Sequence, residues 1–480
     1  MESDSFVDKG VYVYKDRFFG VFLIEAATPF KICSDDYSVV IDSPILTDLN
    51  GLPLIPGTSI AGVLRKTISD YCKINVNDGQ NLLNLADEIF GYAEGDNGKG
   101  SRIVFSHVVI INKDGSPITG IIENLNDFLN LFVSSSLPVR ERNAVNGKGV
   151  TKKHSKFDEQ IAPKGLRFVF EVEFKGNRNN ENDLKAWKIL LNSIKSDNFR
   201  LGGGSRHGFG LFKLINYKEK IYGLNEQNEL KEYLDNGFLS SAKELFDDYE
   251  NNLKNNNEIL IKNETEIIEY NLKLKPKDFF IFSSGFASNS SNADMTSLKE
   301  VAISYDKDKS GKMYYVIPAS SIKGAISHRI AFHYNSIKRN FIEKIDKKEI
   351  ESYTSPQNYG CKLLFGSKKE KSGKEEDNYA GNTFFEDIFI EESKCSLLQL
   401  QHVSIDRFTG KSIDGALFIE EVLSLYKDYD INIRFIIKKE VLDKDADIKK
   451  AIQRTIFDIE NGLLPLGGGV NRGHGVFLKA

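Results

Sequence analysis

The chain is poor in cysteine, methionine and tryptophan, and it contains no long apolar run. Its 480 residues include four cysteines, three methionines and one tryptophan. The cysteines form no Cys-x-x-Cys pair, which argues against a zinc site or a disulfide framework and favours buried thiols. No apolar stretch approaches the roughly 18 residues that a membrane-spanning helix needs, and the acidic, polar start is unlike a signal peptide. We therefore expect a cytoplasmic protein with no membrane partner.

A large excess of charge of one sign is also missing. The formal net charge is −4 at pH 7, with 28% charged and 40% hydrophobic residues. This balance is typical of a globular protein and argues against one that coats nucleic acid through bulk charge. Any surface for nucleic acid must then be a local patch.

What the chain does contain is an internal repeat. The glycine cluster "LGGGSRHGFGLFKL" at 201–214 recurs as "LGGGVNRGHGVFLKA" at 466–480. Three further landmarks recur in the same order: "LIPGTSIAGVLR" with "VIPASSIKGAIS", "IFGY" with "LFGS", and "RNAVNGKG" from Arg142 with "RFTGKS" from Arg407. Order and spacing are preserved, which indicates a duplication.

Each copy predicts the element order strand, helix, strands, helix, strand. The helix after the Ile-Pro pair is expected to be capped by Thr58 or Ser59 in the first copy and by Ser320 or Ser321 in the second. A second amphipathic helix precedes each glycine cluster. This is the split β-α-β layout, so we predict an α+β protein with two tandem ferredoxin-like (RRM-like) domains, 1–217 and 266–480. A polar connector with one or two solvated helices is expected at 218–265.

The glycine clusters follow a helix and open a strand, which is the wrong context for a dinucleotide-binding Gly-x-Gly-x-x-Gly loop. Two interpretations remain open. The clusters are tight turns that need positive φ angles, or they are loops that expose backbone to a phosphate with help from Arg206 and Arg472.

Together these motifs resemble the RAMP superfamily, the repeat-associated proteins of CRISPR–Cas systems. The stretch "IDSPILTDLNGLPLIPGTSIAGVLR" at 41–65 is similar to the signature of the backbone subunit that repeats along type III effector complexes. Two such domains in one chain resemble the fused backbone proteins of type III-D variants. The resemblance implies three kinds of partner: a CRISPR RNA, a target single-stranded RNA and other effector subunits. It also implies endoribonuclease activity on the guide-paired target, with Mg²⁺ or another divalent metal as cofactor.

The resemblance places the catalytic aspartate of the family at Asp42, as a base or as the metal ligand. Without the resemblance, an Asp before Ser-Pro is ordinarily a turn former. In the second copy we expect "EVAISYD", which begins at Glu300, to be the counterpart of "DSPILTD". Asp294, slightly upstream, is a second candidate.

The basic segment "VRERNAVNGKGVTKKHSK" at 139–156 lies where the family has its hairpin-like thumb, and a second thumb is expected at 403–418. Phe408 and Phe418 are candidates for stacking on bases. The predicted RNA-binding residues lie in the thumbs, the glycine clusters and the flanks of the first helices: Lys31, Arg65, Arg140, Arg142, Gly202, Gly203, Gly204, Arg206, Lys323, Arg407, Lys411, Gly467, Gly468, Gly469 and Arg472.

Two alternatives to a target-cleaving subunit remain. The chain is a non-catalytic scaffold for guide RNA, or it is a guide-processing RAMP endoribonuclease with a histidine as the base. His107, His207 and His474 lie near motifs and are the candidates for that base.

Overall fold

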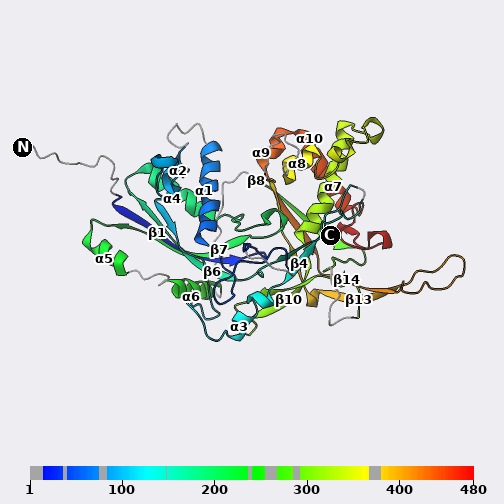
Figure 1. Ribbon diagram of the computed structural model, residues 1–480, viewed down its shortest axis with the longest axis horizontal. Coiled ribbons are helices and arrows are strands. Elements are labelled where there is room, and N and C mark those ends of the chain that lie inside the picture. Colours follow the sequence, from blue (N-terminus) through cyan, green and yellow to red (C-terminus); the bar gives the residue numbers. More distant parts are fainter. Residues whose placement is uncertain are drawn as a thin grey trace, which may run out of the picture.

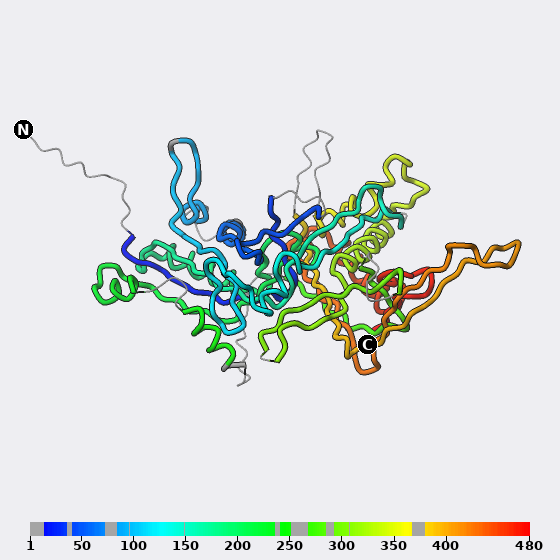
Figure 2. The backbone as a smooth tube through the Cα atoms, turned by 60° about the horizontal axis from the view of Figure 1, so that its bottom comes forward, coloured from blue at the N-terminus to red at the C-terminus, as the bar shows by residue number. Residues whose placement is uncertain are grey.

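The computed structural model describes residues 14–35, 41–74, 84–147, 149–235, 241–253, 267–284, 292–306, 308–366 and 380–480. Two α/β domains lie side by side, and a long hairpin projects from the second domain (Figures 1 and 2). Within this described part of the chain, no helix is long and apolar enough to cross a membrane.

The first domain is built on an antiparallel sheet in the order β2-β6-β1-β7, with β3 also paired to β6. Its central strand β1 reads "DRFFGVFLIEA" and is almost entirely buried, as expected for a strand hydrogen-bonded on both sides. Two long helices pack on one face of the sheet (Figure 1). The elements are β1 (Asp16–Ala26), α1 (Gly57–Ile74), α2 (Leu85–Phe90), β2 (Ile103–Phe105), β3 (Val109–Ile110), α3 (Asp127–Asn130), β6 (Arg167–Gly176), α4 (Glu181–Ile194) and β7 (Phe212–Gly223).

The second domain repeats this topology. Its main sheet has the order β11-β15-β8-β16, the same sequence of strands as in the first domain. The two strand orders confirm the prediction of two tandem ferredoxin-like domains. The elements are β8 (Ile267–Pro276), α7 (Ala319–Lys338), α8 (Tyr359–Phe365), β11 (Thr383–Phe385), β15 (Ile431–Lys438), α9 (Lys439–Lys444), α10 (Ala446–Glu460) and β16 (Phe477–Lys479); a separate sheet contains β9 (Lys299–Ile303), β10 (Gly311–Ile317) and β12 (Ile388–Glu391).

The connector differs from the expectation in two ways. The boundary expected at residue 217 falls inside β7, which continues to Gly223 because it pairs with β1 along its whole length. The connector contains α5 (Gln227–Asp235) and α6 (Ala242–Leu253), and α6 is not merely solvated. Its Leu245 and Phe246 pack into the core of the first domain. Residues 236–240 and 254–265 of the connector lie outside the described residues.

The start of α7 also differs from the expectation. We predicted Ser320 or Ser321 as the N-cap, but the helix begins at Ala319, and the carboxylate of Asp387 accepts the Ala319 N–H at 2.7 Å. An acidic group from elsewhere in the fold thus replaces the local cap. In the first domain α1 begins at Gly57, so Thr58 and Ser59 lie inside its first turn.

Buried polar contacts join the two domains. The Arg140 guanidinium donates to both carboxylate oxygens of Glu300, at 2.5 and 2.7 Å, and lies 2.8 Å from Asp387. All three side chains are at most 5% exposed. Tyr305 from the second half is also buried in the core of the first domain, where its hydroxyl donates to the Ile111 carbonyl at 2.8 Å. The domain arrangement is therefore held by core packing and ion pairing together.

Candidate nucleic-acid interface

The glycine clusters form the same turn in both domains. Gly202 and Gly467 have φ angles of 83° and 97°, which favour glycine. A Cβ at either position would collide with a backbone carbonyl oxygen of the segment that follows the first strand of the domain. That oxygen belongs to Lys31 for Gly202 and to Ile281 for Gly467. The next residue, Gly203 or Gly468, donates its N–H to that same oxygen at 2.8 Å. The interpretation as tight turns is confirmed, and phosphate binding stays a prediction.

The two arginines of these loops are not equivalent. Gly204 and Gly469 each accept the N–H of the residue three positions later, which is His207 in one loop and Arg472 in the other. Arg472 therefore corresponds to His207, and Arg206 corresponds to Asn471. Arg206 points to the second domain, where its Nε donates to the Gly381 carbonyl at 2.7 Å.

Each predicted thumb is an antiparallel hairpin. The first hairpin consists of β4 (Val139–Arg142) and β5 (Phe157–Gln160), and the second consists of β13 (Cys395–His402) and β14 (Phe418–Leu425). Arg142 pairs with Phe157, and His402 pairs with Phe418, at the last position of each ladder. The counterpart of Arg142 is thus His402, not Arg407 as the sequence suggested.

Both hairpins have a buried glutamate at the equivalent position, which the sequence reasoning missed. Glu159 is 1% exposed and forms ion pairs with Lys31 and Arg142. Glu420 is fully buried and contacts Arg472 at 2.6 Å, His402 at 2.7 Å and His474 at 2.9 Å. The recurrence of Phe-x-Glu, "FDE" at 157–159 and "FIE" at 418–420, was the available signal.

These partners determine the charge of Glu420. Burial alone would raise the pKa of its carboxyl, but hydrogen bonds from Arg472, His474 and His402 outweigh burial and lower that pKa. Glu420 is therefore ionised at neutral pH. Glu159 of the first hairpin thus holds the predicted RNA-binding residues Lys31 and Arg142 in place. Glu420 of the second hairpin does the same for Arg472.

Two exposed aspartates lie beside the hairpin bases. Asp42 accepts the backbone N–H of Asp158 at 2.9 Å, and Asp294 accepts that of Ile419 at 2.9 Å. The residues after them form matching parallel bridges to the buried glutamates, Ser43 with Glu159 and Met295 with Glu420. Asp294 is thus the structural counterpart of Asp42.

The expected pairing of "DSPILTD" with "EVAISYD" is therefore wrong. Glu300 corresponds to Asp48, because Leu46 and Leu298 donate equivalent hydrogen bonds to Ile32 and Phe282. The carboxylate of Glu300 is 3% exposed and bound to Arg140, whereas Asp294 is exposed. The aligned letters were misleading because an acidic residue occurs six positions after each aspartate.

The repeated hairpins, glycine loops and aspartates coincide with a match to one family. The RAMP superfamily matches residues 24–213 and 303–477. The chain belongs to the RAMP superfamily. The first match includes Asp42, whereas the second begins after both Asp294 and Glu300. No curated protein matches the chain.

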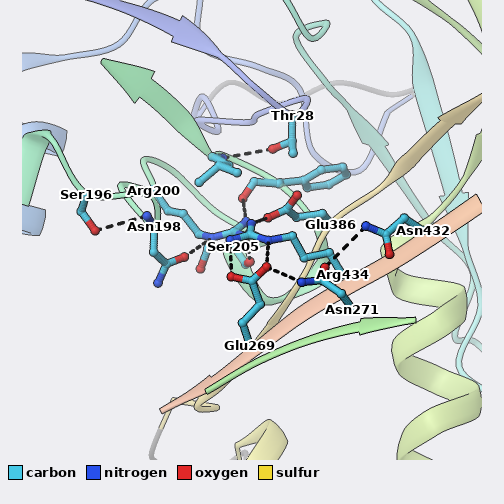
Figure 3. Close-up of polar contacts among 12 residues, drawn as sticks. Thr28, Ser196, Asn198, Arg200, Ser205, Glu269, Asn271, Glu386, Asn432 and Arg434 are labelled. Carbon is cyan, nitrogen blue, oxygen red and sulfur yellow. Dashed lines mark hydrogen bonds and ion pairs between the residues drawn. The ribbon is translucent and has the colours of Figure 1, made fainter. Parts of the chain in front are cut away.

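Polar residues of both RAMP domains lie close together beside the first glycine loop (Figure 3). Arg200 donates to Asn198 Oδ1 at 2.8 Å and to the Ser205 carbonyl at 3.4 Å, and burial lowers the pKa of Arg200 to about 10. Glu386 of the second RAMP domain forms an ion pair with Arg434, which Glu269 also binds at 2.9 Å. The contacts that fix the first glycine loop against the second RAMP domain are the hydrogen bond from Arg206 to the Gly381 carbonyl and the packing of Arg200 and Arg206 over the Phe384 ring, with guanidinium carbons 5.4 and 5.3 Å from the ring centre.

The other predicted RNA-binding residues are spread over both RAMP domains. Arg65 lies on α1 and pairs with Asp87 of α2 at 2.5 Å, apart from the hairpin. Arg140 is enclosed by the domain interface. Lys323 lies in the first turns of α7 and is partly buried. Arg407 and Lys411 are exposed in the loop of the second hairpin, around a Phe408 side chain that is 99% exposed.

The described residues contain no preformed metal-binding site. They contain no group of three or more His, Cys, Asp or Glu side chains that could hold one. Mg²⁺ is commonly bound by one or two carboxylates together with substrate phosphates. The exposed carboxylates of Asp42 and Asp294 suit that shared mode, and Glu300, already bound to Arg140, does not.

Proposed function

We propose that this RAMP protein is a CRISPR RNA-binding backbone subunit of a type III effector complex, similar to the fused type III-D backbone proteins, and that it cleaves guide-paired target RNA. Its proposed partners are the CRISPR RNA, the target single-stranded RNA and other effector subunits. Family membership supports a CRISPR-associated role in RNA binding. The observation that carries cleavage is the recurrence of one exposed aspartate, Asp42 and Asp294, at the same position beside each hairpin base.

RNA cleavage needs the 2′-hydroxyl to attack the adjacent phosphorus in line. An exposed carboxylate that is anchored through one oxygen can accept the proton of that hydroxyl or hold a divalent cation. The anchor is the N–H of Asp158 for Asp42 and that of Ile419 for Asp294. In this proposal Asp42 and Asp294 are the residues that would hold Mg²⁺, which would supply positive charge to stabilise the phosphate.

The test uses the assembled complex with a guide and end-labelled target RNA, in Mg²⁺ or in EDTA. Asp42→Asn should abolish one product, since loss of a base or metal ligand typically costs about 10²-fold or more, and Asp294→Asn should abolish a second. Asp35→Asn, which changes another exposed carboxylate of the same region, is the matched control and should leave both products. Guide binding should be unchanged in all three variants.

Other outcomes favour other functions. If every product survives both changes, the chain is a scaffold for guide RNA. If the chain instead cuts the repeat of the guide and a histidine change abolishes that cut, it is a processing enzyme. His107 is the exposed candidate for that base, whereas His474 is 5% exposed and bound to Glu420.

A further inference from the structure

Three carboxylates lie on neighbouring segments at the base of the first hairpin. Asp42 accepts the N–H of Asp158 at 2.9 Å, and Asp158 pairs with Glu141 across the β4–β5 ladder. Directly opposed residues of a ladder share one face, so the carboxylates of Asp158 and Glu141 lie on the same side. The Glu141 side chain is 7% exposed, and Asp158 Oδ1 is buried without a hydrogen-bond partner in the described part of the chain. Asp42 therefore lies in negatively charged surroundings.

One lysine lies among these carboxylates. The ammonium group of Lys156 is 2.6 Å from the carboxylate of Glu141. The hydrogen bond to Glu141 raises the pKa of Lys156, and the charges of Asp158 and Asp42 add to this effect. The Lys156 side chain is 57% exposed, which leaves its ammonium group accessible to a ligand. A positive charge is thus anchored beside the first aspartate.

This face of the ladder is not the face of the predicted RNA-binding cations. Successive residues of a strand point to opposite faces. Arg142 and Glu159, which form an ion pair with each other, directly follow Glu141 and Asp158 in the chain and so point the other way. Lys156 therefore serves a different surface from Arg142.

The second hairpin has neutral side chains at the equivalent positions. Asp294 accepts the N–H of Ile419, and Ile419 pairs with Gln401 across the β13–β14 ladder. The exposed Leu417 directly precedes β14, as Lys156 directly precedes β5. Ile419, Gln401 and Leu417 thus take the places of Asp158, Glu141 and Lys156, respectively. The duplication kept the aspartate but not its charged neighbours.

The phosphate on which Asp42 would act is itself an anion. Neighbouring carboxylates repel it, and the repulsion is stronger in the transition state, where negative charge builds up on the phosphate oxygens. A cation held at this place offsets the repulsion and favours the transition state over the ground state. The first site needs this compensation more than the second, which has Asp294 as its one carboxylate among these positions.

We infer that Lys156 positions the reacting RNA phosphate beside Asp42, and that the site of Asp294 works without such a group. This inference rests on the proposed cleavage at Asp42. Glu141 fixes the place of the ammonium group from the buried side of the ladder. The two cuts of one RNA should then depend differently on a single lysine.

The test is cleavage of end-labelled target RNA by an excess of the assembled complex, with both products followed separately. The first cut is the one that Asp42→Asn abolishes. Lys156→Met keeps the length of the side chain but removes its charge, and it should slow the first cut about tenfold while the second cut is unchanged. Lys156→Arg restores a cation and should cut at close to the wild-type rate, which a purely structural role of the lysine would not predict.

The matched control is Lys220→Met. Lys220 also forms an ion pair with a glutamate, Glu232, and the hydrogen bond between them likewise raises the pKa of Lys220. The pair joins β7 to α5, and α5 lies far from both hairpins (Figure 1). Lys220→Met should leave both cuts unchanged. Thermal unfolding of all three lysine variants should match the wild type, because exposed ion pairs contribute little to stability.

The outcomes separate the inference from the proposed function. Unchanged cutting by Lys156→Met, equal slowing of both cuts, or loss of the first cut in Lys156→Arg as well would each overturn the inference. If the wild-type complex makes no product, the proposed cleavage fails, and fluorescence anisotropy of labelled RNA at several salt concentrations decides the inference. A salt slope that falls by about one in Lys156→Met but not in Lys220→Met supports a phosphate contact of Lys156, and equal slopes overturn it.

Discussion

The two hairpins have the same strand register and a buried glutamate at the equivalent position, Glu159 in the first and Glu420 in the second, but their surroundings differ. The first hairpin extends over the second domain, where Lys152 lies 3.5 Å from Glu351 and Gly147 lies against Thr354. The second projects away from the body of the protein (Figure 2). Its side chains are apolar and exposed at several positions: Leu397, Leu398, Val403, Ile405, Phe408, Ile413 and Leu417.

One position shows how the copies diverged. Arg140 pairs with Glu159 in the first ladder, and Leu400 pairs with Glu420 in the second. Arg140 is matched by two carboxylates of the neighbouring domain. A duplicated backbone thus acquired a domain interface through its side chains.

The largest effect should come from giving the first hairpin the residue of the second. Arg140→Leu leaves the buried carboxylates of Glu300 and Asp387 without their cation, and breaking such a pair typically costs about 3–5 kcal/mol of unfolding free energy. Urea unfolding of the full chain measures this loss. The reciprocal Leu400→Arg, at a partly exposed site, should change stability by about 0.5 kcal/mol or less. Equal stability of both variants would contradict the assigned role of Arg140.

The glycine loops should instead behave alike in both domains. Gly202→Ala and Gly467→Ala each force a Cβ towards a carbonyl oxygen at a positive φ, at an expected cost of about 1–3 kcal/mol or more. Gly203→Ala is the control, because its Cβ would lie 3.5 Å or more from the nearest atoms. Thermal unfolding measures each variant, and a large effect in only one domain would break the equivalence of the turns.

A smaller effect is expected for the buried glutamate of the second hairpin. Glu420→Gln should lower stability at pH 7 by about 1–3 kcal/mol, since hydrogen bonds to charged partners are lost. Because the native pKa of Glu420 is depressed, its contribution is fully present above the unfolded value and disappears as pH falls through the native one. Thermal unfolding between pH 7 and pH 3.5 should show a constant difference down to about pH 4.5 that shrinks below it. A difference lost already between pH 7 and pH 6 would assign the stabilisation to another group.

The smallest effect on stability is expected at the tip of the second hairpin. Phe408→Ala should leave the unfolding free energy within about 0.5 kcal/mol, because the ring is 99% exposed. If the ring stacks on a base, the same change should weaken RNA binding by about 1–3 kcal/mol. Val150→Ala in the loop of the first hairpin is the matched control and should affect neither quantity. Unchanged RNA affinity for Phe408→Ala would show that the tip of this hairpin does not contact RNA.

The duplication and the fold were predictable from the sequence because periodic apolar residues and glycine turns are local signals. The cap of α7 by Asp387 was not, since the two groups are far apart in the chain. Nor was the pairing of Asp42 with Asp294, because strand register depends on backbone contacts that the letters do not record. Arg140 was predicted to bind RNA because it is a basic residue in a basic segment. Its ion pairs with Glu300 and Asp387 were not predictable, because both carboxylates come from the other domain.

Tyr305 has a consequence for how this protein can change over evolutionary time. Its hydroxyl accepts the Arg167 N–H at 3.1 Å, and its ring packs at 5.1 Å from Phe128, so the second repeat supplies part of the hydrophobic core of the first. A recombination event that separates the repeats at the connector would leave the first one with an open cavity and unmatched polar groups. Substitutions in the core of the first repeat are thereby constrained by a residue of the second, so the two repeats cannot change independently of one another at this point.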